Sequence, residues 1–287
     1  MKKYTFKQIT GNTLTYLALS AWALTTVYPL LWVIINSFKD KREIMSQSFS
    51  IPTGELFTLD NYKLAFEKMD ILGAYLNSMS VSCMVSLIVI VLAGLASYAL
   101  VRYDFPGRNL LQGLILAGMM FPAFSTIIPV FRMESAWGIV NTDSRFLSLL
   151  ALSLPQIAGN LSFAIIVLSG FIKGLPVELE EAAYMEGCNA GQIFFKVIVP
   201  LTKPSFATVG IFSFLWSYND LFTQTFFLRI KDHWAITRLL SELTSREGTN
   251  YGLMASTVTM VIVPVVIVYV CLQKYIIKGM TAGAVKG

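Results

Sequence analysis

The chain has 287 residues, of which 55% are hydrophobic and 14% are charged, and its mean hydropathy is +0.64. Because an average soluble protein has about 25% charged residues, this composition excludes an ordinary water-soluble domain. The formal net charge is +5, but the basic residues are spread along connecting segments, so we expect no nucleic acid as a partner. We expect an integral membrane protein surrounded by a lipid bilayer.

Six continuous apolar blocks follow one another along the chain, and each is long enough to cross a bilayer as a helix, which takes about 20 residues. They cover residues 14–37, 73–101, 110–131, 146–171, 205–228 and 254–277. Helices are favoured over barrel strands because the blocks are continuously apolar, and because a helix satisfies its own backbone groups in lipid. The predicted fold is all-α, with about six transmembrane helices.

This pattern divides the chain into three regions. Residues 1–72 hold an N-terminal segment, the first transmembrane helix and a first extracytoplasmic loop. Residues 73–277 form the transmembrane core, and residues 278–287 form a C-terminal tail. The first block follows three lysines, as in a secretory signal, but it is too long for one and lacks a small-residue cleavage site. We expect it to be retained as a helix.

Several prolines lie inside the apolar blocks, where a water-soluble helix would break. They are Pro29, Pro122, Pro129, Pro155 and Pro264. In lipid such prolines mark kinks that neighbouring helices tolerate, or hinges beside a translocation path. Both interpretations stay open on the sequence.

The connection between the fourth and fifth blocks carries the signals of two short helices. Pro176 suits a first helical position, and the glutamates that follow are favourable near the positive end of a helix dipole. Gly187 can end this helix in a left-handed turn, and Asn189 can cap a second one. Two prolines then close the unit before the next span. The sequence predicts a helix, a turn and a helix that lie parallel to the membrane.

Within this connection the sequence reads E-A-A, three residues, G, nine residues and then V-I-V-P. The residues are Glu181, Ala182, Ala183, Gly187, Val197, Ile198, Val199 and Pro200. The pattern resembles the EAA motif of binding-protein-dependent ABC permeases, E-A-A-x3-G-x9-I-x-L-P, with valine in place of its isoleucine and leucine. Glu186 also occupies a position that is often acidic in the sugar-importing branch of that family.

The resemblance implies that this segment is a coupling helix, which sits in a cleft of a separate ATPase subunit. The small side chains of Ala182 and Ala183 would let that partner approach closely, Glu181 would supply charge, and Gly187 would supply the turn. The connection would then be cytoplasmic, and six spans would place both termini in the cytoplasm. Basic residues divide equally between the two sides of this arrangement and give no orientation of their own.

Two further stretches resemble the maltose-type carbohydrate permeases, so that the resemblance covers residues 77–287. The tail matches G-x-T-x-G-x-V-K-G, and in that family it reaches into the ATPase dimer; the matching residues include Thr281, Gly283, Val285 and Lys286. The fifth block carries an aromatic-Asn-acidic-aliphatic-Phe signature; its candidate solute-path residues are Trp216, Tyr218, Asn219 and Asp220. Aromatic and amide walls suit neutral polar solutes, but these side chains are equally compatible with packing.

The sequence contains no motif for catalysis, nucleotide binding or metal binding. No phosphate-binding loop occurs, so ATP and its Mg²⁺ must be handled by a partner ATPase. His233 is the only histidine; we expect it to be solvated, and we expect no metal site. Asp220 is the one ionisable residue well inside a block, where it can accept bonds from solute hydroxyls or cap a helix. No cofactor and no catalytic residue is expected.

The sequence therefore predicts a permease subunit of an ATP-binding-cassette importer, not an enzyme, which moves a carbohydrate such as an oligosaccharide by alternating access. Its expected partners are a second homologous permease subunit, a cytoplasmic ATPase dimer and an extracytoplasmic solute-binding protein. Its expected location is the bacterial inner membrane, as a multi-pass protein. The alternatives are an ion-coupled secondary transporter of a small polar solute, which needs buried charges, and a membrane-embedded enzyme, which needs clustered catalytic side chains.

Overall fold

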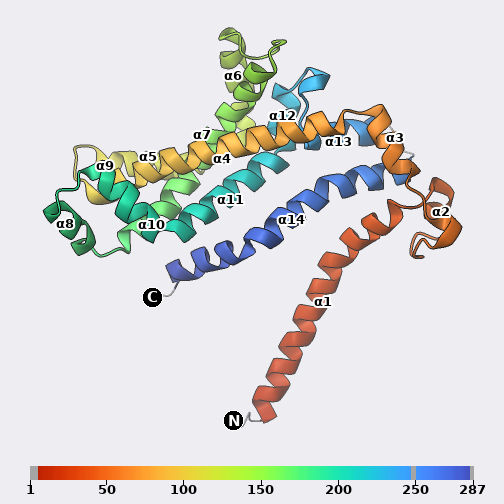
Figure 1. The fold of residues 1–287 in the computed structure, drawn as a ribbon, viewed down its shortest axis with the longest axis horizontal. Coiled ribbons are helices and arrows are strands. Elements are labelled where there is room, and N and C mark those ends of the chain that lie inside the picture. The colour runs from red at the N-terminus through yellow and green to blue at the C-terminus, as the bar shows by residue number, and fades with distance from the viewer. Residues whose placement is uncertain (1–5, 247–249, 285–287) are drawn as a thin grey trace. The chain divides into compact units, whose positions relative to one another are not determined.

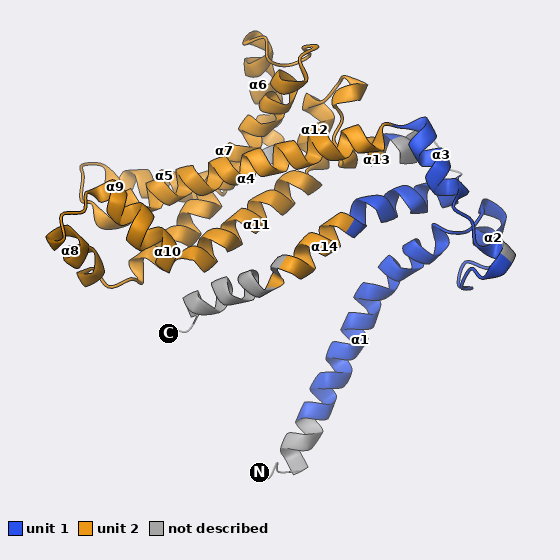
Figure 2. Cartoon of the chain, in the orientation of Figure 1, with its two compact units in different colours: residues 1–69, 242–263 blue, residues 70–241, 264–287 orange. Residues whose placement is uncertain are grey.

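A computed structural model of the protein describes residues 6–246 and 250–284. These residues form helices joined by short connections, and no β-strand occurs among them (Figure 1). The all-α prediction is confirmed. The contacts divide the chain into two compact units, residues 1–69 with 242–263 and residues 70–241 with 264–287 (Figure 2).

The first unit is built around the turn that follows its long N-terminal helix. Its helices are α1 (Phe6–Asn36), α2 (Lys41–Ser46), a 3₁₀ turn (Gly54–Leu56), α3 (Asp60–Lys68) and the start of α14 (Tyr251–Ala284). The Asn61 amide on α3 donates to the carbonyl oxygens of Ser37 at 3.0 Å and Lys39 at 2.8 Å. Gly252 packs against the same amide, because an added Cβ would lie 2.6 Å from Asn61 Oδ1. One buried side chain thus fixes the turn after α1.

The second unit has a core of three helices, α4, α7 and α11, with α4 lying along the other two (Figure 1). Its helices are α4 (Ile71–Arg102), α5 (Arg108–Gly118), α6 (Ala123–Ala136), α7 (Arg145–Lys173), α8 (Glu178–Met185), α9 (Ala190–Ile193), α10 (Val199–Leu201), α11 (Lys203–Asn219), α12 (Leu221–Phe227) and most of α13 (Ile236–Arg246). A π-helical turn (Phe194–Ile198) joins α9 to α10, and a 3₁₀ turn (Lys231–His233) precedes α13.

Small and hydroxylated residues let these helices approach closely, as is usual for helices that pack in lipid. Ser86 on α4 donates to the carbonyl oxygen of Gly210 on α11 at 2.8 Å, and Ser97 on α4 donates to that of Ile165 on α7 at 3.0 Å. A Cβ at Gly210 would lie 2.7 Å from Ile90 Cδ1. The α4–α11 contact therefore depends on the missing side chain of Gly210.

Four helical stretches among the described residues are long and apolar enough to cross a membrane. They are Asn12–Asn36, Ile71–Arg102, Arg145–Lys173 and Tyr251–Cys271. A fifth span results if Ala190–Leu201 and Lys203–Asn219, which meet at an angle of 82°, are counted as one broken span. The predicted count of about six transmembrane helices therefore stays a prediction.

The third apolar block, residues 110–131, is not one helix. Helix α5 ends at Gly118 and α6 begins at Ala123, directly after Pro122. A proline cannot donate a backbone hydrogen bond and disfavours the α conformation in the residue before it, which explains the break. The other prolines of the blocks lie inside helices: Pro29, Pro129, Pro155 and Pro264.

Candidate functional site

The chain after α7 forms the predicted helix, turn and helix. Gly187 has a φ of +84°, so its left-handed conformation, expected from the sequence, is confirmed. Its N–H donates to the carbonyl oxygen of Tyr184 at 2.9 Å, and the N–H of Cys188 donates to that of Ala183 at 3.0 Å. These two bonds form a Schellman motif, in which a residue without a Cβ ends a helix and satisfies its last carbonyls.

The second helix begins with a reciprocal cap. The side chain of Asn189 accepts from the N–H of Gln192 at 2.9 Å, and the side chain of Gln192 accepts from the N–H of Asn189 at 2.9 Å. This capping box satisfies two backbone donors that a helix start leaves unpaired. The predicted cap at Asn189 is therefore confirmed.

Pro176 sits differently from the prediction, whereas Pro200 and Pro204 lie on either side of the turn that closes the segment, as predicted. Pro176 is not the first helical residue, because α8 begins at Glu178 and Val177 is its N-cap. Pro200 lies inside α10, whose helical run continues to Leu201. The change of direction occurs at Thr202, where the stretch of residues 190–201 and α11 meet at an angle of 82°.

One face of α8 points outward, and its far side is anchored. Glu181, Ala182 and Glu186 are exposed, and Met185 is 89% exposed. Ala183, expected to face a partner together with Ala182, is buried instead, because the helical period places the two on different faces. The surface that a partner can reach therefore includes Glu181, Ala182, Met185 and Glu186.

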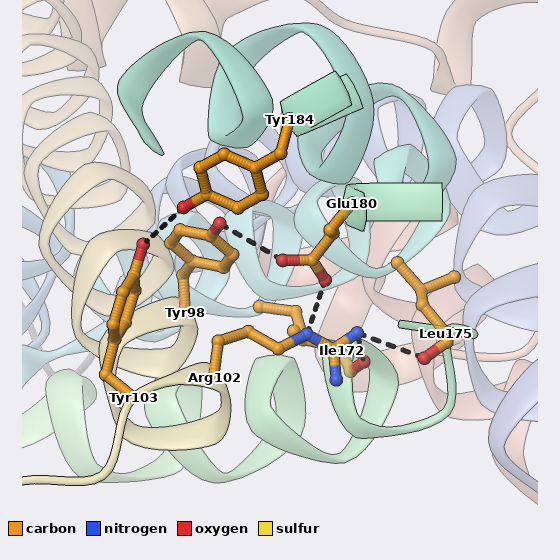
Figure 3. A network of polar contacts seen from close by, with 7 residues as sticks. All are labelled: Tyr98, Arg102, Tyr103, Ile172, Leu175, Glu180 and Tyr184. Carbon is orange, nitrogen blue, oxygen red and sulfur yellow. Dashed lines mark hydrogen bonds and ion pairs between the residues drawn. The ribbon is translucent and has the colours of Figure 1, made fainter. Parts of the chain in front are cut away.

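Glu180 anchors the inner side of α8 through a polar network that sequence reasoning missed (Figure 3). Its carboxylate accepts from Arg102 Nε at 2.5 Å and from the Tyr98 hydroxyl at 3.1 Å. Arg102 Nη2 also donates to the carbonyl oxygens of Ile172 at 2.9 Å and Leu175 at 3.0 Å, at the end of α7. The network joins α4, α7 and α8. In the sequence, the only sign of this role was that Glu180 is a glutamate beside the motif residue Glu181.

A second feature is a cavity of about 430 Å³ between α6, α7, α11 and α12. Its aromatic lining comes from Phe124, Trp216 and Phe222, and its polar lining includes Gln156, Asn160, Asn219, Asp220 and Thr223. Phe124 and Phe222 meet edge to face, with ring centroids 4.4 Å apart. A pocket with aromatic walls and several amide groups can hold a polar solute that has apolar C–H faces.

Three of the four candidate solute-path residues, Trp216, Asn219 and Asp220, line this cavity. Tyr218 does not line it. It is fully buried and stacks on Phe214, with ring centroids 6.1 Å apart, because it faces the opposite side of α11. Tyr218 is therefore a packing residue, as the alternative interpretation held.

Asp220 belongs to a chain of hydrogen bonds at the break between α11 and α12. Its Oδ1 accepts from the N–H of Thr223 at 3.0 Å, so the helix-cap interpretation is confirmed. Its Oδ2 accepts from Gln156 Nε2 at 2.9 Å, and Gln156 Oε1 accepts from the Ser217 hydroxyl at 2.7 Å. The carboxylate thus caps α12 and also lines the cavity.

The prediction of a solvated histidine was wrong. His233 is buried, and its Nδ1 lies 3.0 Å from the hydroxyl oxygen of Ser148 on α7. The short 3₁₀ turn folds back on the core, so a loop position in the sequence became a buried one. Among the described residues, no group of three potential metal ligands occurs.

The tail residues are only partly described. Thr281 and Gly283 lie in the last turn of α14, which ends at Ala284. Val285 and Lys286 lie outside the described residues. Their predicted contact with an ATPase stays a prediction.

Comparison with known proteins gives a family match over most of the chain. The model of the family described as "Binding-protein-dependent transport system inner membrane component" matches residues 74–282. This range contains both the α8–α10 segment and the residues that line the cavity.

Several curated proteins are similar over nearly the whole length. The diacetylchitobiose uptake system permease NgcG of Streptomyces coelicolor is 31% identical over 94% of this chain and 87% of its own length. The trehalose transport system permease SugB of Mycobacterium tuberculosis is 34% identical, with coverages of 90% and 92%. The arabinooligosaccharides transport system permease AraQ of Halalkalibacterium halodurans is 33% identical, with coverages of 92% and 93%.

A solved structure has the same fold. It is a crystal structure of a bacterial ABC transporter involved in the import of the acidic polysaccharide alginate, and one of its chains matches with a TM-score of 0.78. The match covers 96% of this chain and 99% of that chain at 23% sequence identity. At this identity the likeness concerns the fold alone.

Proposed function

Since this chain belongs to the family of inner membrane components of binding-protein-dependent transport systems, we propose that it is the permease subunit of an ATP-driven carbohydrate importer. It is a multi-pass membrane protein and a transport subunit rather than an enzyme. Its relatives are named as permeases for diacetylchitobiose, trehalose and arabinooligosaccharides, which supports a carbohydrate as the solute. The ion-coupled alternative has no support in these relatives.

The observation that carries the proposal is the geometry of the α8–α10 segment. Helix α8, anchored through Glu180, has a small residue and two carboxylates on its exposed face and ends in a left-handed glycine, at the positions of the EAA motif. Such a surface suits insertion into a partner's cleft. We assign it to contact with a cytoplasmic ATPase dimer, which binds the ATP and Mg²⁺, and the tail at Thr281, Gly283, Val285 and Lys286 to a second contact with that dimer.

The solute path in this subunit would run past the cavity lined by Trp216, Asn219 and Asp220. Its volume of about 430 Å³ is in the range of small-molecule sites, and it can hold part of an oligosaccharide. A second homologous permease subunit would supply the other wall. A solute-binding protein would deliver the sugar from outside. With the α8–α10 segment in the cytoplasm, six spans would place both termini of this chain there as well.

Transport by purified components tests the proposal. The chain is reconstituted in liposomes with the second permease subunit, the ATPase and the solute-binding protein, and uptake of radiolabelled chito-, gluco- and arabino-oligosaccharides is measured. We expect uptake of at least one sugar that requires internal ATP, fails with a nonhydrolysable analogue, and persists when ionophores collapse the proton and sodium gradients. Uptake by the chain alone, driven by an ion gradient, would contradict the proposal.

A further inference from the structure

Three residues of α4 stand on one face of the helix, at spacings of four, where the helix meets the α8–α10 segment. They are Gly94, Tyr98 and Arg102. Residues four apart lie one above the other on a helix surface, so these three form a continuous strip about two turns long. Together they contact the chain from the end of α7 to the first turn of α11.

At the Arg102 end of the strip the contact is an ion pair. The side chains of Arg102 and Glu180 are only 10% and 6% exposed. If the pair were broken, little water could therefore solvate either charge. Arg102 is also bonded to two carbonyls at the end of α7, where a cation is favourable toward the helix dipole. Removing one partner of such a buried pair is costly, because the other charge is left buried and unpaired. The contact between α8, α4 and α7 therefore resists separation.

At Tyr98 and Gly94 the strip makes close contacts with aromatic rings. The rings of Tyr98 and Phe194 have centroids 5.4 Å apart, and those of Phe194 and Phe206 lie 6.5 Å apart. A Cβ at Gly94 would lie 2.7 Å from Phe206 and 3.3 Å from Phe194. Phe194 stands before the 82° bend and Phe206 stands after it. The strip thus holds both arms of the bend against α4.

From these contacts we infer that the strip of Gly94, Tyr98 and Arg102 makes α8, the bend, α4 and the end of α7 move as one body, with Arg102 as the positioning residue. The inference rests on the proposed function, in which α8 receives the movement of an ATPase. A displacement of α8 then reaches α4 and α7 directly through the buried ion pair. Without the pair, α8 can move while α4 stays in place, and ATP is hydrolysed without transport.

The first test compares Arg102→Met and Arg102→Lys with Asp104→Asn in the full assembly. Asp104 is a matched control, because it also forms an ion pair, with Arg108, but its side chain is 97% exposed. For Arg102→Met we expect the ratio of sugar imported to ATP hydrolysed to fall about tenfold, within the range of coupling between sites. Arg102→Lys keeps the charge but not the planar fork, so we expect a smaller loss. The control should keep the parent ratio.

The second test restores the connection by covalent means. Tyr103 directly follows α4 and Tyr184 lies on α8; their hydroxyl oxygens are 3.4 Å apart and both residues are exposed (Figure 3). In a chain with Cys83, Cys188 and Cys271 replaced by serine, cysteines at positions 103 and 184 are bridged by a flexible bismaleimide. We expect the bridge to leave transport by the parent intact, and to raise the sugar-to-ATP ratio of Arg102→Met at least about threefold.

The outcomes separate the inference from the proposed function. If the unaltered assembly imports no sugar with ATP, the proposed function fails. If it does so, but Arg102→Met keeps the parent ratio, or the bridge stops transport in the parent, then α8 moves independently of α4 and the inference is overturned. Loss of assembly in Arg102→Met alone shifts the decision to the Arg102→Lys ratio and to the bridged parent, both of which still discriminate.

Discussion

Gly187 holds a backbone conformation that side chains with a Cβ adopt only at a cost. With φ at +84° and nothing within 4 Å of an added Cβ, the obstacle to a substitution there is strain and not crowding. We expect Gly187→Val to distort the end of α8, and to lower both sugar uptake and the stimulation of ATPase activity by the binding protein about tenfold or more. Both rates are measured on the reconstituted assembly.

Gly107 provides the control for this substitution. Its φ of +85° is nearly the same, it also has free space around it, and it lies before α5, outside the α8–α10 segment. Gly107→Val therefore carries similar strain without touching the proposed partner surface. Equal loss of coupling in both variants would show that strain anywhere in the fold is sufficient, and would remove the special role of Gly187.

Each carboxylate oxygen of Asp220 accepts a different hydrogen bond, one from the Thr223 backbone and one from the Gln156 side chain. In Asp220→Asn the amide oxygen can still cap α12, but the amide nitrogen would face the Gln156 amide, which is a donor. We expect the KM for sugar to rise several-fold, by about 1 kcal/mol, while ATP dependence is retained. Initial uptake rates at varied sugar concentration measure this, with the exposed Asp143→Asn as control. An unchanged KM would exclude Asp220 from the solute path.

Residues whose roles follow from local spacing could be predicted, whereas those that act through distant partners could not. Gly187 and Asn189 were found because caps and turns involve neighbours within a few positions. Arg102 pairs with Glu180, 78 positions away, and Gln156 pairs with Asp220, 64 positions away. Nothing in a single sequence marks such pairs. Ala183 was misjudged because its motif position does not reveal which side of α8 is covered.

At the scale of helices, the contact between α4 and α11 depends on one missing side chain. Gly210→Val would place a branched side chain against Ile90, where even a Cβ comes within 2.7 Å of Cδ1. We expect this variant to lose about 1–3 kcal/mol of stability through overpacking. The measurement is the midpoint of thermal aggregation of the detergent-solubilised protein.

A second substitution tests the cause. Ile90→Ala removes the opposing atoms, so Gly210→Val combined with Ile90→Ala should be more stable than Gly210→Val alone. Additive losses in the double variant would mean that the two residues do not oppose each other, and that α4 and α11 pack in another way.

The existence of the apolar helices could be predicted, but their breaks could only partly be. Hydrophobic length identifies the stretches of chain that lipid can accommodate, and four of the six blocks correspond to long helices. The third block breaks at Pro122 and the fifth at Asp220. A proline inside an apolar block allows either a kink or an end, and the tertiary contacts of α6 and α12 decide which.

For the whole molecule, orientation is the property that follows least from composition, because the basic residues divide equally between the sides. We expect cysteines introduced at Ser46 and at Lys286 to react with a membrane-impermeant thiol reagent from opposite sides. Ser46 ends α2 and is exposed. The experiment uses intact cells and inverted vesicles of a chain without its native cysteines. Labelling of both positions from the same side would remove the six-span arrangement.

The 82° bend at Thr202 allows a displacement of the chain before it to be converted into a rotation about the axis of α11. Residues 190–201 form an arm nearly perpendicular to α11, and at 1.5 Å per residue its length is about 18 Å. Because the strip of Gly94, Tyr98 and Arg102 holds both arms of the bend against α4, a sideways push of about 5 Å on the end of this arm would turn α11 and α4 together by about 16° about the axis of α11. Trp216 and Asn219 lie on α11 and line the cavity, so they would swing with it. A small displacement of the proposed cytoplasmic segment would thus become a rotation of side chains that line the cavity.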